Sequence, residues 1–180
     1  MNEDADRTDR QFALMTEIRL IADRLGIELW LRGGWAMDFF LGEVTRAHRD
    51  IDFYAWARDA RKLAHELALK GYAPLAGPPP EQQLDFTKKE EDLSFALLAD
   101  NPQGQVVVAG GPFAGEPWPT GMLNGPVRTL RDVSYRVITP ESQIEIKQMM
   151  PIWVPGRPRR QKDREDIERI RRALESSELP

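Results

Sequence analysis

The chain has 180 residues, 41% of them hydrophobic, which is the length and composition of one ordinary domain with a packed core. It contains no cysteine, which excludes thiol catalysis, disulfides and thiolate metal sites, so any metal would be held by oxygen or by its two histidines, His48 and His65. The formal net charge of -4 gives no general attraction to nucleic acid, and no apolar run approaches the ~18 residues of a membrane helix.

The first 71 residues predict alternating helices and strands. Thr8 and Gln11 have the spacing of a capping box at the start of the first helix, and Gly26 is a suitable stop for it. The pair Gly33-Gly34 separates a short apolar strand from the next helix. In chain order, apolar periodicity predicts a helix over 9–25, a strand over 27–31, a helix over 35–41, a strand over 49–56 and a helix over 58–70.

Beyond residue 71 the pattern changes to short strands followed by helices. The glycines and prolines of residues 110–126 disfavour any single regular element there. The order of elements predicts an α+β fold, a mixed sheet packed with helices. We expect one domain over residues 1–180, with a catalytic core over 8–139 and a helical segment over 140–180. The predicted elements are a hairpin of strands 82–88 and 92–98, strands 105–109 and 136–138, and helices 140–150 and 163–174.

Two aspartates, Asp50 and Asp52, lie two positions apart in the predicted strand over residues 49–56. Alternate residues of a strand point to the same face, so both carboxylates share one face while Ile51 and Phe53 point into the core. Carboxylates about 6–7 Å apart repel one another unless a cation lies between them. A hard divalent ion such as Mg²⁺, which also binds triphosphate oxygens, suits this arrangement. The simpler alternative is the polar outer face of an amphipathic strand.

Two further features are candidates for nucleotide binding and catalysis. Gly33-Gly34 stands where glycine lets the backbone approach a ligand and where the amides of the following helix can bind phosphate. A plain tight turn is the alternative. Asp92 opens the second strand of the predicted hairpin. If this strand lies beside the one that carries Asp50, the carboxylate could be a third ligand or a general base; otherwise it belongs to an acidic cluster at the hairpin tip.

The order of these features matches a known family. Residues 29–38 contain Gly-Gly-Trp-Ala-Met-Asp, and residues 41–52 contain Thr-Arg-Ala-His-Arg-Asp-Ile-Asp. At this spacing the two segments resemble the aminoglycoside and lincosamide nucleotidyltransferases, which belong to the DNA polymerase beta-like nucleotidyltransferase superfamily. The match is dense over residues 29–53. Weaker resemblances cover residues 91–95 and 162–167.

The resemblance implies roles for individual residues. Asp92 takes the position of the family's third carboxylate if the preceding hairpin is shortened; without that gap the position falls near Ala96, and the general base is missing. Asp38 is expected to be structural, and His48 to order its loop, because imidazole is a poor ligand for Mg²⁺. The implied catalytic and metal-binding residues are Asp50, Asp52 and Asp92, and the implied nucleotide-binding residues are Gly33, Gly34, Arg46 and Lys147.

The function implied by the resemblance is Mg²⁺-dependent transfer of a nucleoside monophosphate, AMP from ATP or another nucleoside triphosphate, to a hydroxyl of an aminoglycoside, a lincosamide or another small molecule. A nucleotide-binding module with little catalysis and an enzyme with a macromolecular acceptor are the alternatives. Phe113 and Trp118 could shape a pocket for a flatter, less charged acceptor. For a polycationic acceptor, the acids that could line a cleft are Glu81, Asp85, Glu90, Glu91, Asp92 and Asp100.

Charge and the first residues indicate where the protein acts. Residues 1–10 are acidic and polar, unlike a secretory signal, and we expect a cytoplasmic protein without a membrane partner. The acidic balance also disfavours a large nucleic acid as acceptor. The oligomeric state is left open.

Overall fold

The computed structural model describes residues 3–177 and contains one mixed β-sheet. Its strands run in the order β3-β4-β5-β2-β1-β8-β7, and β6 pairs with the end of β5. The pairs β2–β5 and β1–β8 are parallel, and the other pairs are antiparallel. The strands are β1 (Leu29–Arg32), β2 (Asp50–Trp56), β3 (Ala73–Pro74), β4 (Gln83–Lys88), β5 (Glu91–Asp100), β6 (Val106–Val108), β7 (Val127–Leu130) and β8 (Val133–Val137).

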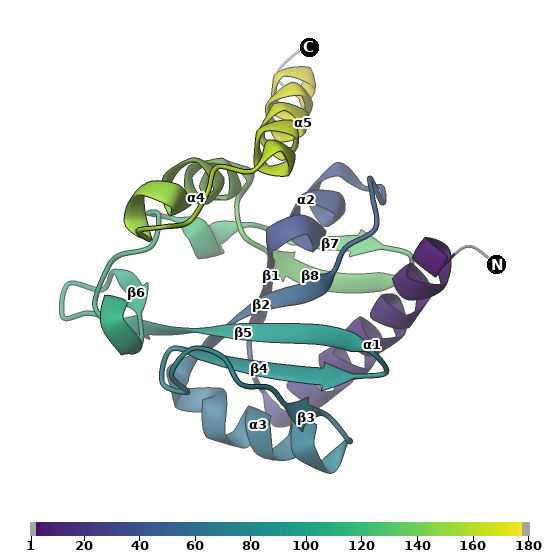
Figure 1. The fold of residues 1–180 in the computed structure, drawn as a ribbon, viewed down its shortest axis with the longest axis vertical. Coiled ribbons are helices and arrows are strands. Elements are labelled where there is room, and N and C mark those ends of the chain that lie inside the picture. Colours follow the sequence, from purple (N-terminus) through teal and green to yellow (C-terminus); the bar gives the residue numbers. More distant parts are fainter. Residues whose placement is uncertain (1–2, 178–180) are drawn as a thin grey trace.

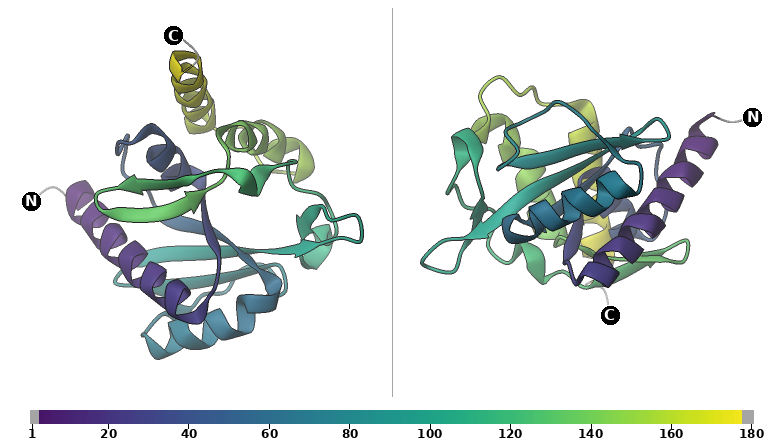
Figure 2. Two further views of the ribbon diagram at one scale, coloured as in Figure 1. Left: turned by 180° about the vertical axis from the view of Figure 1, so that it is seen from behind. Right: turned by 90° about the horizontal axis from the view of Figure 1, so that it is seen from below.

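Helices pack around this sheet in two groups. Helices α2, α4 and α5 gather at one end of the molecule and α3 lies at the other (Figure 1). Helix α1 crosses the sheet and meets α3 (Figure 2, left). The α-helices are α1 (Glu3–Leu25), α2 (Gly33–Leu41), α3 (Ala60–Leu69), α4 (Pro140–Trp153) and α5 (Gln161–Ser177), and the 3-10 helices are η1 (Ala57–Asp59), η2 (Gly111–Phe113) and η3 (Met122–Asn124).

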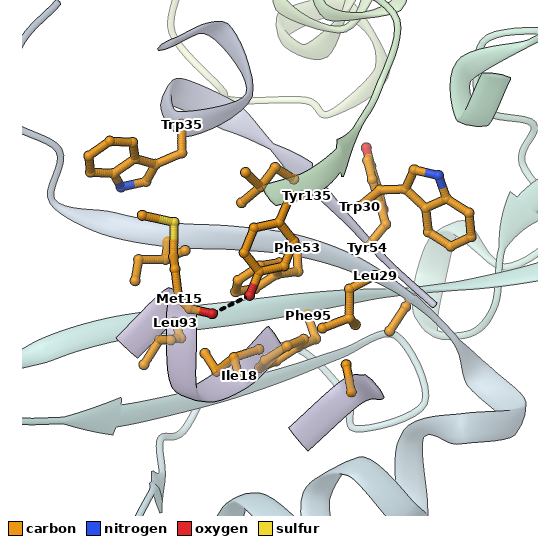
Figure 3. Packing of buried hydrophobic residues seen from close by; sticks show 14 of the residues in the cluster. Met15, Ile18, Leu29, Trp30, Trp35, Phe53, Tyr54, Leu93, Phe95 and Tyr135 are labelled. Atoms are coloured by element: carbon orange, nitrogen blue, oxygen red, sulfur yellow. Dashed lines mark hydrogen bonds between the residues drawn. The ribbon is translucent and has the colours of Figure 1, made fainter. Parts of the chain in front are cut away.

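Alternation along the central strands separates an apolar face from a polar face. Phe53 on β2 and Phe95 on β5 are fully buried, and their rings stack with centroids 5.1 Å apart. They pack in one cluster with Met15 of α1 (Figure 3). Asp50 and Asp52, on alternate positions of β2, belong to the opposite face. The predicted α+β fold with a mixed sheet is confirmed, and α1 covers the face away from the candidate acids.

The first helix begins earlier than predicted, at Glu3. The first turn carries Glu3, Asp4 and Asp6, and negative side chains stabilise the positive end of a helix. The Thr8 hydroxyl donates to the Asp4 carbonyl at 2.9 Å, a bond made inside a helix. The prediction that Thr8 caps the helix was therefore wrong.

A hairpin of β7 and β8 replaces the single strand predicted over 136–138. Its turn residues, Arg131 and Asp132, have φ of 47° and 65°, the left-handed geometry of a two-residue hairpin turn. The usual glycine signal is absent from this turn. Helix α4 also passes its predicted end at Met150 and reaches Trp153, although Pro151 has no amide hydrogen to donate.

Among residues 3–177, no helix is long and apolar enough to cross a membrane. Residues 1–2 and 178–180, at the two ends of the predicted single domain, lie outside the described residues. The predicted division into a core over 8–139 and a segment over 140–180 stays a prediction.

Candidate active site

Parallel pairing of β2 with β5 places the third candidate carboxylate beside the first. The register pairs Asp50 with Asp92. Adjacent strands lie about 4.8 Å apart, and paired residues point to the same face. Asp92 therefore lies next to the Asp50–Asp52 pair, whereas Ala96, the alternative position, lies further along β5 and has no carboxylate.

A row of polar side chains crosses three strands beside these acids. Arg32 on β1 lies opposite Asp52 in the antiparallel register, and Ser94 Oγ donates to Asp52 Oδ1 at 2.6 Å. The Arg32 guanidinium lies over the Tyr54 ring, 4.7 Å from its centroid. Together with the candidate acids, these side chains line a cavity of about 620 Å³. The rest of its lining comes mainly from α4, α5 and the segment between them, including Lys147, from the loop before β2, and from the region that runs from the end of β3 into β4, including Asp85.

Gly33 and Gly34 begin α2 at the wall of this cavity, and neither position accepts a larger residue without displacement. Gly33 has a φ of 68°, and a Cβ atom there would lie 2.8 Å from Asp52 Oδ2. A Cβ atom on Gly34 would lie 2.3 Å from His48 Nδ1. Arg32, at the N-cap, makes no capping hydrogen bond with its side chain. The first amides of α2 are therefore available to an anion.

Asp38 and His48 hold the loop between α2 and β2. The buried Asp38 carboxylate accepts a hydrogen bond from Thr45 Oγ1 and another from His48 Nε2, each 2.7 Å long. Arg46 Nη1 donates to His48 Nδ1 at 2.9 Å. Because a guanidinium only donates, His48 carries its proton on Nε2. The structural roles predicted for Asp38 and His48 are confirmed.

Arg46 and Lys147, both predicted to contact the triphosphate, meet a buried carboxylate on α5. Asp166 Oδ2 accepts from Arg46 Nη2 at 2.9 Å and from Lys147 Nζ at 3.0 Å. Burial acts to raise the pKa of Asp166, but Lys147 and Arg46 outweigh it and hold the pKa below its usual value. Both cations line the cavity, and both are already partly neutralised. Their contact with the triphosphate stays a prediction.

Two charged groups of opposite sign in the cavity, Asp50 and Lys162, attract one another but form no hydrogen bond or close ion pair with any of residues 3–177. Burial, and then the charge of Asp52, raise the pKa of Asp50 above its usual value. On the α5 side, burial and then the charges of Arg160 and Arg46 lower the pKa of Lys162. The Lys162 ammonium forms no hydrogen bond or ion pair with the described residues. A divalent cation at the aspartates and a phosphate near Lys162 would relieve both imbalances.

The three aspartates supply the hard oxygen donors that Mg²⁺ prefers. Within residues 3–177, no three acidic or histidine side chains already converge on a metal-binding geometry. The pairing of Asp50 with Asp92 and the raised pKa of Asp50 nevertheless fit a divalent cation, because rotation about χ1 can bring carboxylates on adjacent strands together. The metal-binding roles of Asp50, Asp52 and Asp92 stay predictions.

The acidic cleft predicted from six residues does not form. Of these residues, only Asp85 and Asp92 line the cavity. Glu91 is fully buried on the opposite face of β5, where Arg10 Nη2 lies 2.7 Å from its carboxylate. Alternation along the strand explains this, since Glu91 and Asp92 are neighbours and point to opposite faces. The others, Glu81, Glu90 and Asp100, are exposed and lie outside the lining.

Sequence reasoning missed several charged residues of the site, among them Arg32 and Asp166. Arg32 ends an apolar strand, and nothing in its local sequence indicates which cavity it enters. Asp166 could have been found, because Asp163, Ile167 and Ile170 lie with it at the spacing of a buried helix face. An acid in such a stripe implies a buried cationic partner.

Solved structures with the same architecture define the class of protein as a nucleotidyltransferase fold. ANT(2'')-Ia in complex with adenylyl-2''-tobramycin superposes with a TM-score of 0.73 at 22% identity, covering 93% of this chain and 91% of that chain. The lincosamide antibiotic adenylyltransferase LnuA, lincomycin-bound, superposes with a TM-score of 0.68 at 20% identity, covering 87% and 94%. Residues 14–170 match the aminoglycoside-2''-adenylyltransferase family, and the chain belongs to this family.

Curated relatives match over a shorter segment. A 2''-aminoglycoside nucleotidyltransferase of Klebsiella pneumoniae is 50% identical over 42 residues, which are 23% of this chain and 24% of that protein. A lincosamide resistance protein of Staphylococcus haemolyticus is 36% identical over 50 residues, 28% of this chain and 31% of that protein. These matches thus span about a quarter to a third of the relatives' length. The predicted family resemblance is confirmed.

Proposed function

We propose that the chain transfers a nucleoside monophosphate, AMP from ATP, to a hydroxyl of a small molecule, with Mg²⁺ as cofactor. The observation that carries this proposal is the register of β2 and β5, which pairs Asp50 with Asp92. Membership of the aminoglycoside-2''-adenylyltransferase family supports the reaction type. The names of the relatives, aminoglycoside and lincosamide enzymes, support an antibiotic hydroxyl as acceptor.

The triphosphate would lie at the start of α2. The amides of Gly33 and Gly34 are the donors there, and the positive end of the helix favours the negative charge. Lys162 offers an unpaired ammonium from α5 in the same cavity. Arg46 and Lys147 would add to this positive charge, each donating to phosphate oxygens as well as to Asp166.

Asp50, Asp52 and Asp92 would hold Mg²⁺, which supplies charge neutralisation for the transferring phosphoryl group. Asp92 also accepts the proton of the acceptor hydroxyl. The hydroxyl oxygen bonds to the α-phosphorus, and the bond from the α-phosphorus to the oxygen that bridges to the β-phosphate breaks. Pyrophosphate leaves, and the acceptor carries the AMP group.

The test is pyrophosphate release from ATP and Mg²⁺ with tobramycin or lincomycin as acceptor, with mass spectrometry of the product. Asp92→Asn should lower kcat by about 10²–10⁴-fold, the range of a lost general base. Asp100→Asn is the matched control, because Asp100 lies at the exposed end of the same strand and outside the cavity. It should keep the wild-type rate.

Two outcomes would contradict the proposal in different ways. Full activity of Asp92→Asn would show that Asp92 is not the general base. Tight binding of ATP with no pyrophosphate release from any acceptor would instead favour a nucleotide-binding module.

A further inference from the structure

A second cavity, of about 1040 Å³, opens directly beside the candidate active site. One side of it is formed by the segment from β6 to η3 and the other by the end of α4. Arg32, Gln83, Met150 and Arg157 line both cavities, so the two are continuous. A molecule seated in the second cavity can therefore present a hydroxyl group to the candidate aspartates.

The lining of this second cavity is mainly apolar. It includes Val106, Phe113, Trp118, Met122, Leu123 and Trp153. Such a surface favours the apolar part of a ligand, because binding removes apolar area of both from water. Its uncharged polar side chains are Gln82, Gln83, Gln105, Thr120 and Asn124, which can bind hydroxyl groups but do not offset a positive charge.

Its charged groups cancel one another. The acids in the lining are Glu116 and Glu145, and they are matched by Arg32 and Arg157. In the adjoining candidate site, Asp163 is paired with Arg160 and Asp166 with Arg46 and Lys147. With Asp50, Asp52 and Asp92 assigned to Mg²⁺, Asp85, which accepts a hydrogen bond from Gln83, is the remaining carboxylate of that lining without a hydrogen-bonded or ion-paired cation among the described residues. One such carboxylate is little negative charge for a ligand with several ammonium groups.

Arg32 stands at the junction of the two cavities. Its guanidinium stacks over the Tyr54 ring and forms no hydrogen bond or ion pair with the described residues, so its five N–H donors are free. These groups only donate, so they suit a carbonyl, hydroxyl or anionic oxygen and offer no acceptor to an ammonium ion. Tyr54 Oη and Trp118 Nε1 are buried on the same side without hydrogen-bond partners among residues 3–177, and their rings meet edge to face at 5.1 Å.

We propose that the acceptor is a hydroxyl compound with an apolar body and at most one positive charge, seated in this second cavity with an oxygen on Arg32. Polycationic aminoglycosides are then poor acceptors of this member of the family. The inference rests on the proposed function for the reaction, but the occupant of the cavity can be tested by binding alone.

The test is a calorimetric measurement of ligand binding at equilibrium. The protein is first loaded with Mg²⁺ and a non-hydrolysable ATP analogue. The ligands are lincomycin, which has one basic amine, neutral p-nitrophenyl β-D-glucopyranoside, and tobramycin, a polyamine. We expect lincomycin and the neutral glycoside to bind at least ~10-fold more tightly than tobramycin, and Trp118→Ala to weaken both selectively. Tighter binding of tobramycin, or no binding of the first two ligands, would overturn the inference.

Two variants that each add one negative charge, one inside the lining and one outside it, test the effect of charge in the cavity. Gln105 and Gln103 lie in the same turn and are both exposed, but Gln105 lines the cavity and Gln103 is outside the lining. Gln105→Glu should improve tobramycin binding several-fold relative to lincomycin, and Gln103→Glu should leave the ratio unchanged. Equal ratios for the two variants would contradict the assignment. Pyrophosphate release is read separately: its absence with every ligand refutes the proposed transfer, whereas binding with the opposite preference refutes only the acceptor class.

Discussion

The loop between α2 and β2 and the open wall of the candidate site use charge in opposite ways. In the loop, Asp38, His48 and Arg46 are joined by hydrogen bonds that continue to Asp166 on α5. On the open wall, Asp50 and Lys162 have no hydrogen-bonded partner in the described part of the chain. In the first region, which we call the paired region, the polar groups bind one another and fix the shape of the loop. The second keeps its charges available, as a site for a metal and a triphosphate requires.

The largest effect is expected from Asp50→Asn, on the open wall. Loss of a partner behind a metal ligand costs about 10–100-fold, so loss of a ligand itself should reduce transfer by at least ~100-fold. The folded-state pKa of Asp50 is raised, which means that its ionised form is less stable in the folded than in the unfolded chain. At neutral pH the neutral amide removes that cost. The Tm in EDTA should therefore stay equal or rise.

Thermal unfolding in EDTA between pH 7 and pH 4 checks this sign. A raised folded-state pKa contributes stability that is present at low pH and lost as the pH rises through that pKa. The Tm of the wild type should therefore rise relative to that of Asp50→Asn as the pH falls. Asp100→Asn is again the control. A Tm lowered by several degrees at pH 7 would show that Asp50 already has a stabilising partner.

Asp166→Asn, in the paired region, should act on stability instead. Removing one partner of a buried ion pair costs about 3–5 kcal/mol. Because the side chains of Arg46 and Lys147 are 27% and 12% exposed, we expect a smaller loss, about 2–3 kcal/mol in urea unfolding. Asp163→Asn on the same helix should cost below about 1 kcal/mol, because its partner Arg160 is 54% exposed.

The pH dependence of the Asp166→Asn effect follows from the lowered pKa of Asp166. The stability contributed by a carboxylate with a depressed pKa is present above the unfolded value and lost as the pH falls through the folded one. The difference between wild type and variant should stay constant from neutral pH down to about 5 and narrow below the ordinary value of 3.8. A difference that widens in acid would contradict the pairing.

The same two regions show what the sequence could and could not predict. Periodicity of two along β2 placed Asp50 and Asp52 on one face, because that pattern depends only on local geometry. Asp92, on β5, is 42 residues after Asp50 in the chain, and only the tertiary register brings the two together. The buried stripe of α5 could have indicated that Asp166 is buried, but only the tertiary structure gives its cationic partners, which come from a loop and from another helix.

Two further predictions failed because residue type alone did not indicate the local structure. Glu91 was expected at a cleft but is buried against Arg10, because alternation on β5 turns it away from Asp92. The β7–β8 hairpin was missed because Arg131 and Asp132, without a glycine, adopt its left-handed turn.

Gly34→Ala tests the shape of the paired region with a smaller effect. Alanine usually stabilises a helix by up to about 1 kcal/mol relative to glycine. Here its Cβ atom would lie 2.3 Å from His48 Nδ1, so we expect a net destabilisation of about 1–2 kcal/mol. In a His48→Ala background the same substitution should be nearly neutral or stabilising. An equal cost in both backgrounds would show that His48 is not the obstacle.

The smallest effect is expected from a pair of lysines, one from each region. Lys147 is hydrogen-bonded to Asp166, whereas Lys162 has no such partner and has a pKa lowered by burial and by neighbouring cations. A phosphate would offset that repulsion, so Lys162→Met should weaken the binding of a non-hydrolysable ATP analogue by about 3–10-fold, which is about 0.7–1.4 kcal/mol, the net value of one ordinary hydrogen bond. Its effect on Tm should be small.

Lys147→Met is the matched comparison, because it removes the same charge from the same cavity. It leaves Asp166 with Arg46 as its remaining hydrogen-bonded cation, so it should lower Tm more than Lys162→Met and ATP affinity less. Calorimetric binding and thermal unfolding of both variants separate the two effects. The opposite result, with ATP affinity lost mainly in Lys147→Met, would mean that the triphosphate displaces Asp166 from Lys147 and that the paired region rearranges when nucleotide binds.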